Sequence, residues 1–369
     1  MQLSGDMSAP FLQESNFWWL TGIEEPGWRA IVDTAPHGRT ILVRPDVSET
    51  HRIFEGGLSD SEAIDISGAD DVISDKEFEA CLRQLARKRS LVYTIDVKHQ
   101  HDFVLNPAQQ NLVSVLKRCF TAVEDCSRKL AELRAIKDPE EIRRMRAAAK
   151  LTCEAFAEVR EDLAGMRREH DIEAEFTYLF GKRGAGHAYA PIVASGKNAC
   201  TLHYGKNSDK LTARNPVLID IGARVSGYSA DVTRTYCLNP TKRQKTVHAA
   251  LEKAHQRCIE LLGPDVLVAD YFSGVDEIMK DALQEIGVLS DRTDDDTYRR
   301  YFPHSVSHGL GVDTHDSLGR PRYFRPGMVL TVEPGIYLPD EGIGMRIEDD
   351  ILITATGTDN LTGSLSTSL

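Results

Sequence analysis

The 369-residue sequence lacks any run of about 18 apolar residues, the length that a membrane-spanning helix needs. The segment from Met1 to Pro10 also lacks the basic-then-apolar order of a secretory signal. We therefore expect a cytoplasmic protein that has no membrane partner.

Cysteine pairs and an excess of basic residues are missing as well. The seven cysteines are odd in number, widely scattered and free of any CxxC pair, so we expect reduced thiols. Lysine and arginine together number 44 against 56 aspartate and glutamate residues, a formal net charge of -12. Because phosphate binding needs a basic face, this composition argues against a nucleic-acid partner.

The N-terminal part of the chain has the pattern of a small α/β domain. Between residues 17 and 97, short apolar runs alternate with helix-like stretches such as residues 76–89. Apolar residues then recur at helical spacing over residues 107–133, which predicts a connecting helix. We expect this α/β domain and its linker helix to cover residues 1–135.

Helix-capping residues mark the start of a second domain, residues 136–369. Asp138, Pro139 and Glu141 occupy the N-cap, first and third positions of a predicted helix. Amphipathic helices are expected at residues 139–161, 169–183, 241–262 and 270–286, with strands around residues 217–231 and after the last helix. Without internal repeats, this order predicts an α+β domain.

Two aspartates interrupt apolar strands in this second domain. Asp220 follows the apolar run 217–219, and Asp231 opens the next strand. A charge inside such a run needs a partner. A turn centred on residues 225–226 would place the two carboxylates opposite each other, with Cβ atoms about 5 Å apart. At that distance they repel each other unless a cation lies between them.

A histidine-rich loop and another strand carboxylate follow. His304, His308 and His315 lie among glycines, which allow the backbone to approach a bound ligand closely. Glu333 then ends the apolar strand at residues 329–332. This arrangement predicts a ligand-binding loop beside a carboxylate.

The carboxylates and one imidazole suit a pair of divalent cations. Arg346 and Glu348 alternate along one predicted strand and so share a face. Hard oxygen ligands can bridge two ions while an imidazole completes one shell. Taken singly, each of these residues is better explained by a structural role, such as an aspartate that caps a turn or a histidine packed in the core, so the prediction rests on the whole set in order. The predicted ligands are Asp220, Asp231, His308, Glu333 and Glu348.

Two further histidines carry no such prediction. His248 and His255 are seven residues apart in the predicted helix 241–262. A paired metal-ligand role is open to them, but we expect packing or surface positions.

Several motifs resemble the pita-bread metallopeptidases (M24B), which include aminopeptidase P, prolidase and methionine aminopeptidase. The resemblance covers the whole chain and rests on residues 192–196, 202–204, 220–236, 304–316, 333–335 and 344–350. Residues 15–22 resemble the start of the extra domain that aminopeptidase P and prolidase carry and that methionine aminopeptidases lack. The resemblance implies a creatinase-like α/β domain followed by a pita-bread catalytic domain that acts on proline-containing peptides.

The resemblance also implies roles for individual residues. The predicted ligands would bind two divalent metals, commonly manganese in this family, with cobalt and zinc as other candidates. His203 and His315 match histidines that contact the substrate or the developing oxyanion, and His304 matches one that lines the proline subsite. Arg346 and Tyr337 match groups on the substrate side. A homodimer is the family expectation.

The predicted activity is hydrolysis of the peptide bond between an N-terminal residue and a following proline, as in aminopeptidase P. Glu333 is expected to take a proton from the attacking water and pass it to the leaving nitrogen. The rival is prolidase, which accepts only the dipeptide, but the short link between Tyr337 and Gly344 favours aminopeptidase P. A metal-free binding or chaperone protein and a creatinase-like hydrolase are disfavoured, because every ligand position is filled.

Overall fold

The computed structural model describes residues 2–4, 7–8, 11–96 and 107–369. Residue 97, at which the predicted α/β alternation ends, lies outside them. The chain divides into two compact units, Met1–Leu130 and Ala131–Leu369. The domain boundary after residue 135, which the capping residues indicate, stays a prediction.

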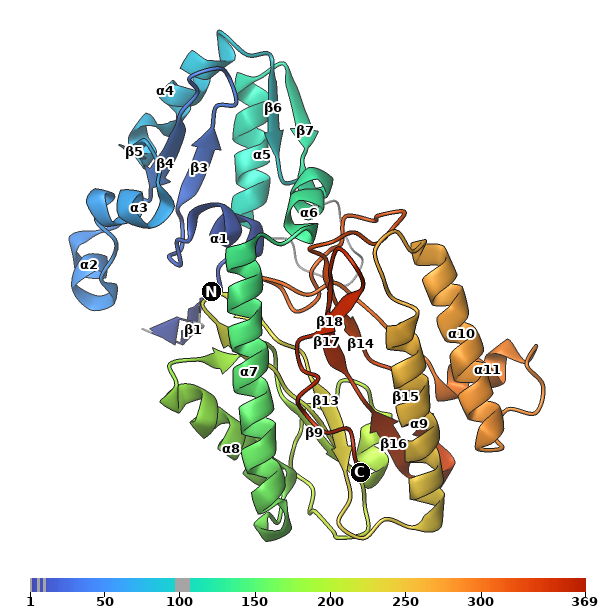
Figure 1. The fold of residues 1–369 in the computed structure, drawn as a ribbon. Coiled ribbons are helices and arrows are strands. Elements are labelled where there is room, and N and C mark those ends of the chain that lie inside the picture. Colours follow the sequence, from blue (N-terminus) through green and yellow to red (C-terminus); the bar gives the residue numbers. More distant parts are fainter. Residues whose placement is uncertain (1, 5–6, 9–10, 97–106) are drawn as a thin grey trace. The chain divides into compact units, whose positions relative to one another are not determined.

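The first unit consists of short sheets with helices packed on them (Figure 1). β3 (Arg29–Val32) pairs antiparallel with β4 (Thr40–Arg44), and β4 pairs in parallel with β5 (Asp71–Ser74). β6 (Leu91–Thr94) and β7 (Ala122–Asp125) form a second parallel pair. Parallel strands need crossover connections, and helices supply them here, which confirms the α/β class of this unit. The remaining elements are β1 (Gln2–Ser4), β2 (Met7–Ser8), α1 (Ser15–Thr21), α2 (Glu49–Glu55), α3 (Asp60–Ser67), α4 (Asp75–Ala86), α5 (Pro107–Cys119) and α6 (Ser127–Ala135), of which α6 runs on into the second unit.

The single connecting helix expected over residues 107–133 was wrong. The structure divides this segment into α5, β7 and α6. Val123 of β7 lies opposite Val92 of β6, and Phe120 closes the end of α5 against Leu116 in the core of this unit. An apolar pair in so short a strand also fits a helical period, so the sequence pattern did not separate the two structures.

The second unit contains the helices that the sequence predicts. They are α7 (Pro139–Asp162), α8 (Glu169–Lys182), α9 (Lys242–Glu260) and α10 (Val268–Glu285). Its strands are β8 (Gly186–His187), β9 (Ile192–Ser195), β10 (Val217–Asp220), β11 (Ala223–Val225), β12 (Tyr228–Ser229), β13 (Thr233–Tyr236), β14 (Val329–Val332), β15 (Gly335–Leu338), β16 (Ile343–Arg346), β17 (Asp349–Ile353) and β18 (Thr358–Asn360). Short helical turns complete it: η1 (Leu163–Gly165), η2 (Gly196–Cys200), α11 (Asp295–Tyr301) and η3 (Pro339–Glu341).

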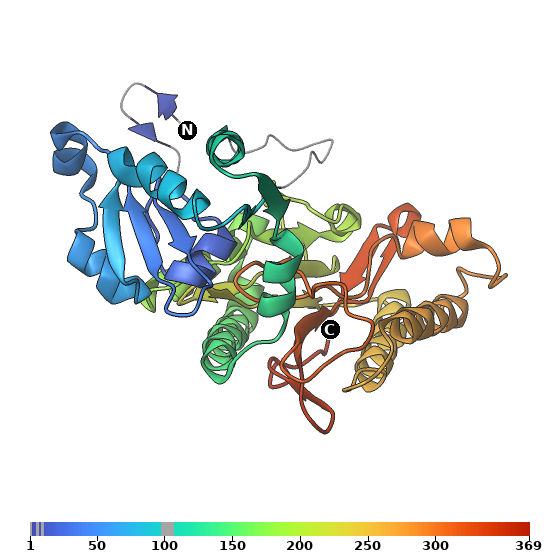
Figure 2. The same cartoon turned by 90° about the horizontal axis from the view of Figure 1, so that it is seen from above.

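Two antiparallel sheets form the centre of the second unit. β10 lies between β9 and β13, and β17 lies between β14 and β18. α7 packs against β11 and β12 and α8 against β8 and β9, whereas α9 lies against β14, β15 and β16 and pairs with α10 (Figures 1 and 2). Every residue of β10, β13, β14 and β17 is buried. Polar residues within these strands are therefore enclosed by the fold.

Each helix pair has its own apolar core. In the first, the rings of Phe156 in α7 and Phe176 in α8 meet edge to face with centroids 4.8 Å apart, and Val193 of β9 is buried beside them. In the second, Leu251 of α9 and Met279 of α10 are buried against the β14–β17 side. Because burial of each large apolar side chain stabilises the fold by about 1.5–3 kcal/mol, these cores hold the strands rigidly in place.

The start of α7 has the capping box that the sequence predicts. Asp138 Oδ1 accepts a hydrogen bond from Glu141 N at 2.8 Å, and Glu141 Oε2 accepts one from Asp138 N at 2.8 Å. These bonds satisfy N–H groups that have no acceptor within the helix. The first turn of α7 is thereby defined beside the loop that precedes it.

Asp138→Ala is expected to lower the free energy of unfolding by about 1 kcal/mol, because it removes one half of this capping box. Urea denaturation followed by circular dichroism measures the change. Lys150→Ala, at an exposed position of the same helix, is the control and should change the value by less than about 0.5 kcal/mol. Equal losses in the two variants would contradict the capping role.

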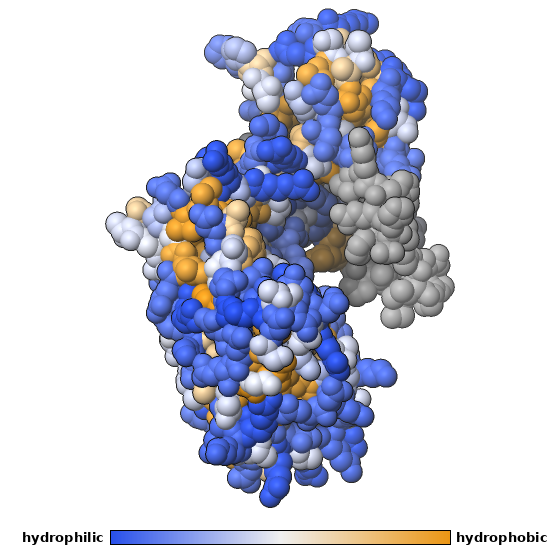
Figure 3. Space-filling model, turned by 90° about the vertical axis from the view of Figure 1, so that its right-hand side faces the viewer, coloured by the Kyte–Doolittle hydropathy of each residue, from blue (hydrophilic) through white to orange (hydrophobic). Residues whose placement is uncertain are grey.

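None of the helices among the described residues is both long and apolar enough to cross a membrane. On the face drawn in Figure 3, hydrophilic residues cover most of the described surface, and hydrophobic residues emerge in separate groups. This surface agrees with a sequence in which 27% of the residues are charged.

Candidate metal centre

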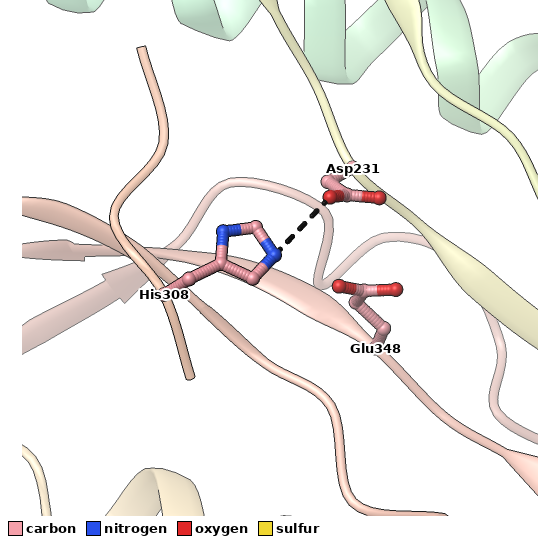
Figure 4. Close-up of side chains that lie close together, drawn as sticks. All are labelled: Asp231, His308 and Glu348. Carbon is pink, nitrogen blue, oxygen red and sulfur yellow. Dashed lines mark ion pairs between the residues drawn. The ribbon is translucent and has the colours of Figure 1, made fainter. Parts of the chain in front are cut away.

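Asp231, His308 and Glu348 converge within the second unit (Figure 4). One ligand atom of each, a carboxylate oxygen or an imidazole nitrogen, lies within 4.8 Å of those of the other two. His308 Nε2 is 3.5 Å from Asp231 Oδ2. Asp231 and Glu348 are 4% and 2% exposed. Buried carboxylates beside an imidazole form a donor set that suits a divalent cation.

Glu333 adjoins this cluster at the end of β14, as the sequence predicts. Its Oε1 lies 3.5 Å from His308 Nε2, and its Oε2 lies 3.7 Å from His304 Nδ1. The backbone explains this placement: Glu333 N donates to Val306 O at 2.8 Å, and Thr331 N donates to His308 O at 2.9 Å. The histidine-rich loop therefore runs beside β14 and delivers two imidazoles to the carboxylate.

Asp220 reaches the site on β10, but the expected pairing of Asp220 with Asp231 was wrong. Asp220 lies opposite Thr233 in the β10–β13 register. The turn is centred on Ser226 and Gly227, which have φ values of 48° and 82°. A turn with positive φ at both central residues matches the twist of a hairpin and favours glycine at its second position. The register moves by two residues, so Asp220 and Asp231 stay on one face.

Arg346 links several predicted site residues to Asp220. Its Nη2 donates to Asp220 Oδ2, and its Nη1 donates to Tyr337 Oη at 2.9 Å. Its Nε donates to Thr233 Oγ1 at 3.1 Å. Tyr337 Oη in turn lies 2.8 Å from His304 Nε2. The three residues predicted on the substrate side, His304, Tyr337 and Arg346, thus form one hydrogen-bonded chain that ends at a predicted metal ligand.

Glu348 is held by β13 rather than by the strand expected to carry it. β16 ends at Arg346, and Glu348 forms an isolated bridge with Thr233. Thr233 Oγ1 donates to Glu348 Oε2 at 2.6 Å, so the side chains of Arg346 and Glu348 still meet the same hydroxyl. The fully buried Arg234 donates to Glu348 O and to Asp349 Oδ1, each at 2.6 Å. Together with the bond from Glu348 N to Thr233 O at 3.0 Å, they fix the backbone on both sides of the Glu348 side chain.

His203 and His315 lie at the exposed edge of this group. The ring centroid of His315 is 4.3 Å from that of His308. Burial lowers the pKa of His315, and the positive charges of His308 and His203 lower it further. Burial also lowers the pKa of His304 to about 4, with Arg346 and His203 adding to the effect. His203 is therefore close enough to both imidazoles to influence their charge.

The pKa shifts of the buried carboxylates and of His308 indicate that the cluster suits a metal ion. Burial raises the pKa of Glu333 to about 7 and that of Glu348 well above its ordinary value, and Asp231 adds to both shifts. Burial alone would lower the pKa of His308, but the Asp231 and Glu333 carboxylates outweigh it and raise the value to about 9. These enclosed carboxylates have too little positive charge around them to be stable in the ionised form. A divalent cation bound between them would supply that charge.

Two protein-family models match parts of this chain. Residues 143–355 match the model of a family described as Metallopeptidase family M24. The chain belongs to this family. Residues 1–93 of this M24 peptidase match a second description, Aminopeptidase P, N-terminal domain. Family membership implies a divalent metal, and the cluster of Asp231, His308 and Glu348 is the candidate place for it.

Relatives of this M24 peptidase resemble it along nearly the whole chain. The Xaa-Pro aminopeptidase of Escherichia coli K12 is 33% identical over 98% of this chain and 88% of its own. Human Xaa-Pro aminopeptidase 3 is 30% identical over 95% of this chain and 74% of its own. The solved structure of zinc-substituted E. coli aminopeptidase P with product has a TM-score of 0.88 at 31% identity and covers 100% of this chain and 89% of that one. Proline aminopeptidase P II of Yersinia pestis has a TM-score of 0.87 at 32% identity, with 100% and 90% covered. These matches confirm the pita-bread fold expected from the sequence.

Two residues of this M24 peptidase site were missed by the sequence analysis. Tyr189 Oη donates to Asp220 Oδ1 at 2.6 Å, and nothing in its local sequence indicated this. Asp350 accepts hydrogen bonds from Asp231 N at 3.2 and 3.3 Å, and burial raises its pKa well above the ordinary value. The run of three acidic residues ending at Asp350 inside an apolar strand was a usable signal.

The histidines of α9 pack inside this M24 peptidase. His248 and His255 are buried, and His255 Nε2 lies 3.5 Å from Asp349 Oδ2. Burial lowers the pKa of His255 to about 4, so it is neutral at pH 7. Within the part of the chain that the structure describes, neither belongs to a metal-binding cluster.

Proposed function

We propose that this M24 peptidase is a Xaa-Pro aminopeptidase that removes an N-terminal residue from peptides with proline in second place. The proposal is carried by similarity to Xaa-Pro aminopeptidases that runs through both the N-terminal domain and the catalytic domain, covering 98% of this chain in the E. coli relative. A methionine aminopeptidase would lack the N-terminal domain. The substrates are proline-containing peptides.

The proposed metals are two divalent ions, with manganese favoured and cobalt or zinc as other candidates. The residues that would hold them are Asp220, Asp231, His308, Glu333 and Glu348. When bound, such ions act as Lewis acids and lower the pKa of water at the site. The donor set supports this proposal, because oxygen ligands dominate it and a single imidazole completes it.

Glu333 is the proposed general base. Its carboxylate lies 3.5 Å from the His308 ring and 3.7 Å from the His304 ring, at the junction of the metal cluster and the substrate-side chain. In the metal-free protein burial raises its pKa to about 7, so this carboxylate has the raised proton affinity that a general base uses. We propose that His203 and His315, which are both exposed, donate hydrogen bonds to the developing oxyanion.

His304 is the proposed proline-subsite residue. Proline offers no N–H to a binding site, so recognition must use its ring and the flanking groups. The His304 ring meets those of Phe302 and Tyr337 edge to face, with centroids 5.1 and 5.4 Å apart. Phe302 and Tyr337 are buried, so the partly exposed ring of His304, which lies beside the Glu333 carboxylate, is the part of this group that we propose meets the proline ring.

The proposal predicts cleavage of a Xaa-Pro-Xaa tripeptide by protein supplied with manganese, and loss of that cleavage on chelation. Mass spectrometry of the released first residue measures it, with a Xaa-Pro dipeptide in parallel. Cleavage of the dipeptide alone would move the assignment to prolidase, the alternative within the family. Cleavage of neither peptide by metal-loaded protein would overturn the proline-directed function.

Other features of the proposed enzyme remain sequence-based predictions. A homodimer, a cytoplasmic location and the absence of a nucleic-acid or membrane partner belong to this group. Sedimentation of the purified protein would test the dimer directly.

A further inference from the structure

A group of buried charges lies under the histidine-rich loop, outside the predicted metal ligands. The side chains of Arg134 and Lys137, just before α7, are 5% and 1% exposed. Both face Asp316, whose side chain is 3% exposed: Arg134 Nη2 lies 3.0 Å from Oδ1, and Lys137 Nζ lies 3.8 Å from Oδ2. Arg134 also donates to Asp313 at 2.8 Å. Burying such charges costs several kcal/mol per ion, so their retention calls for a physical reason.

The Lys137 ammonium is the least satisfied member of this group. Its Nζ is buried and meets no hydrogen-bond acceptor among the described residues. Burial lowers the pKa of Lys137, which Asp316 and Glu141 oppose. Burial likewise raises the pKa of Asp316, which Lys137 and Arg134 oppose. Each charge of the Lys137–Asp316 pair therefore favours the ionised form of the other, with Arg134 and Glu141 adding to the effect.

Gly309 and Gly311 allow the histidine-rich loop to pass directly over the Lys137–Asp316 pair. Asp316 N donates to Gly309 O at 2.8 Å, and the two residues form a bridge. A Cβ at Gly311 would lie only 2.3 Å from Asp316 Oδ2, so the backbone crosses directly above the carboxylate. His308 precedes this bridge and His315 precedes Asp316, and their ring centroids are 4.3 Å apart. The closure thus brings the two imidazoles together.

We propose that Lys137 and Asp316 are positioning residues for His315, which they hold beside His308 by anchoring the closed loop. The His315 residue is exposed apart from the contact of its ring with that of His308, so the anchored backbone at Asp316 is the main constraint on where its ring lies. The kinetic part of this inference rests on the proposed function, in which His315 meets the oxyanion. The structural part concerns the chain alone and can be tested without turnover.

Lys137→Met keeps the length of the side chain and removes its charge. We expect kcat on the Xaa-Pro tripeptide to fall about tenfold with KM within about twofold, because a displaced His315 weakens contacts made in the transition state. Lys150→Met, at an exposed position of α7, is the matched control and should leave both constants unchanged. The double variant K137M/D316N should lose less than the product of the two single losses, because the two charges compensate each other.

Nuclear magnetic resonance of the metal-free protein supplies the readout that does not depend on activity. In Lys137→Met the imidazole resonances of His315 should move, while those of His170, an exposed histidine in α8, should not. A variant that loses thermal stability but keeps the His315 resonances and kcat would overturn the proposal. Failure of the wild-type protein to cleave any Xaa-Pro peptide would instead overturn the proposed function and leave the resonance test intact.

Gly311→Ala tests the same inference if Lys137→Met does not fold. The added methyl group displaces the Asp316 carboxylate while leaving both charges in the chain. The His315 resonances should shift as before, whereas Gly357→Ala, which adds a methyl group with nothing within 4 Å, should leave them in place. Unchanged His315 resonances in a folded Gly311→Ala protein would contradict the proposal.

Discussion

Glu333→Gln is expected to lower kcat on the Xaa-Pro tripeptide by roughly 10²- to 10⁴-fold while the protein keeps its metal. The amide has the size of the carboxylate and retains an oxygen that can bind a cation, but it cannot take up a proton. In the metal-free protein, burial raises the pKa of Glu333 to about 7, so this carboxylate binds a proton more readily than an exposed one. The substitution therefore removes proton transfer selectively.

Steady-state kinetics and metal analysis of the same sample measure this expectation. Glu285→Gln is the matched control, since Glu285 lies at the end of α10 and pairs with Lys253 at 2.9 Å. It should leave kcat and metal content unchanged. A Glu333→Gln protein that binds metal and retains the wild-type kcat would contradict the role of general base. Loss of both metal and activity would assign Glu333 to metal binding alone.

The sequence pattern predicted the members of the site better than their arrangement. A carboxylate at the end of an apolar strand is unusual enough to be noticed, which is why Asp220 and Glu333 could be selected without a structure. The convergence of Asp231, His308 and Glu348 is long-range, and here the family resemblance supplied what periodicity could not. Their roles as ligands stay predictions that metal analysis can test.

Errors arose where one or two residues decide the local geometry. The hairpin register depends on positive φ at Ser226 and Gly227, and a one-residue shift of the turn moved the pairing by two residues, from Asp231 to Thr233 opposite Asp220. A register shift of two residues leaves every side chain on the same face of its strand. The alternation of apolar and polar residues therefore could not reveal the error. Tyr189 was missed for a related reason, since its contact with Asp220 depends on tertiary packing.

The metal-free protein is expected to lose stability as the pH rises from about 7 to about 9, and bound metal should oppose this loss. His308 has a pKa of about 9 in the folded protein against an ordinary value of 6.5. A group whose pKa is raised by folding stabilises the protein below its unfolded pKa, and this stability is lost as the pH passes through the folded pKa. The difference corresponds to about 3 kcal/mol for His308 alone.

The raised pKa values of Glu333 and Glu348 also stabilise the metal-free protein at low pH, and for Glu333 this stabilisation is lost mainly between pH 4.5 and about pH 7, below the range in which His308 titrates. The pKa of Glu333 is raised to about 7 and that of Glu348 well above its ordinary value, both chiefly by burial, so rising pH forces charge onto enclosed carboxylates. A divalent cation reverses the balance, because it binds neutral imidazole and ionised carboxylate and competes with protons for both. The increase in Tm caused by metal should therefore be larger at pH 9 than at pH 6.5.

Thermal unfolding with chelator or manganese at pH 6.5 and pH 9 measures these differences. His308→Gln should flatten the pH dependence of the metal-free protein, since it removes the group that titrates there. His170→Gln, which replaces an exposed histidine of α8, should leave that dependence unchanged. A metal-free protein that grows more stable between pH 7 and pH 9 would show that the enclosed charges are balanced in some other way, and the case for a cation at this site would then rest on family membership alone.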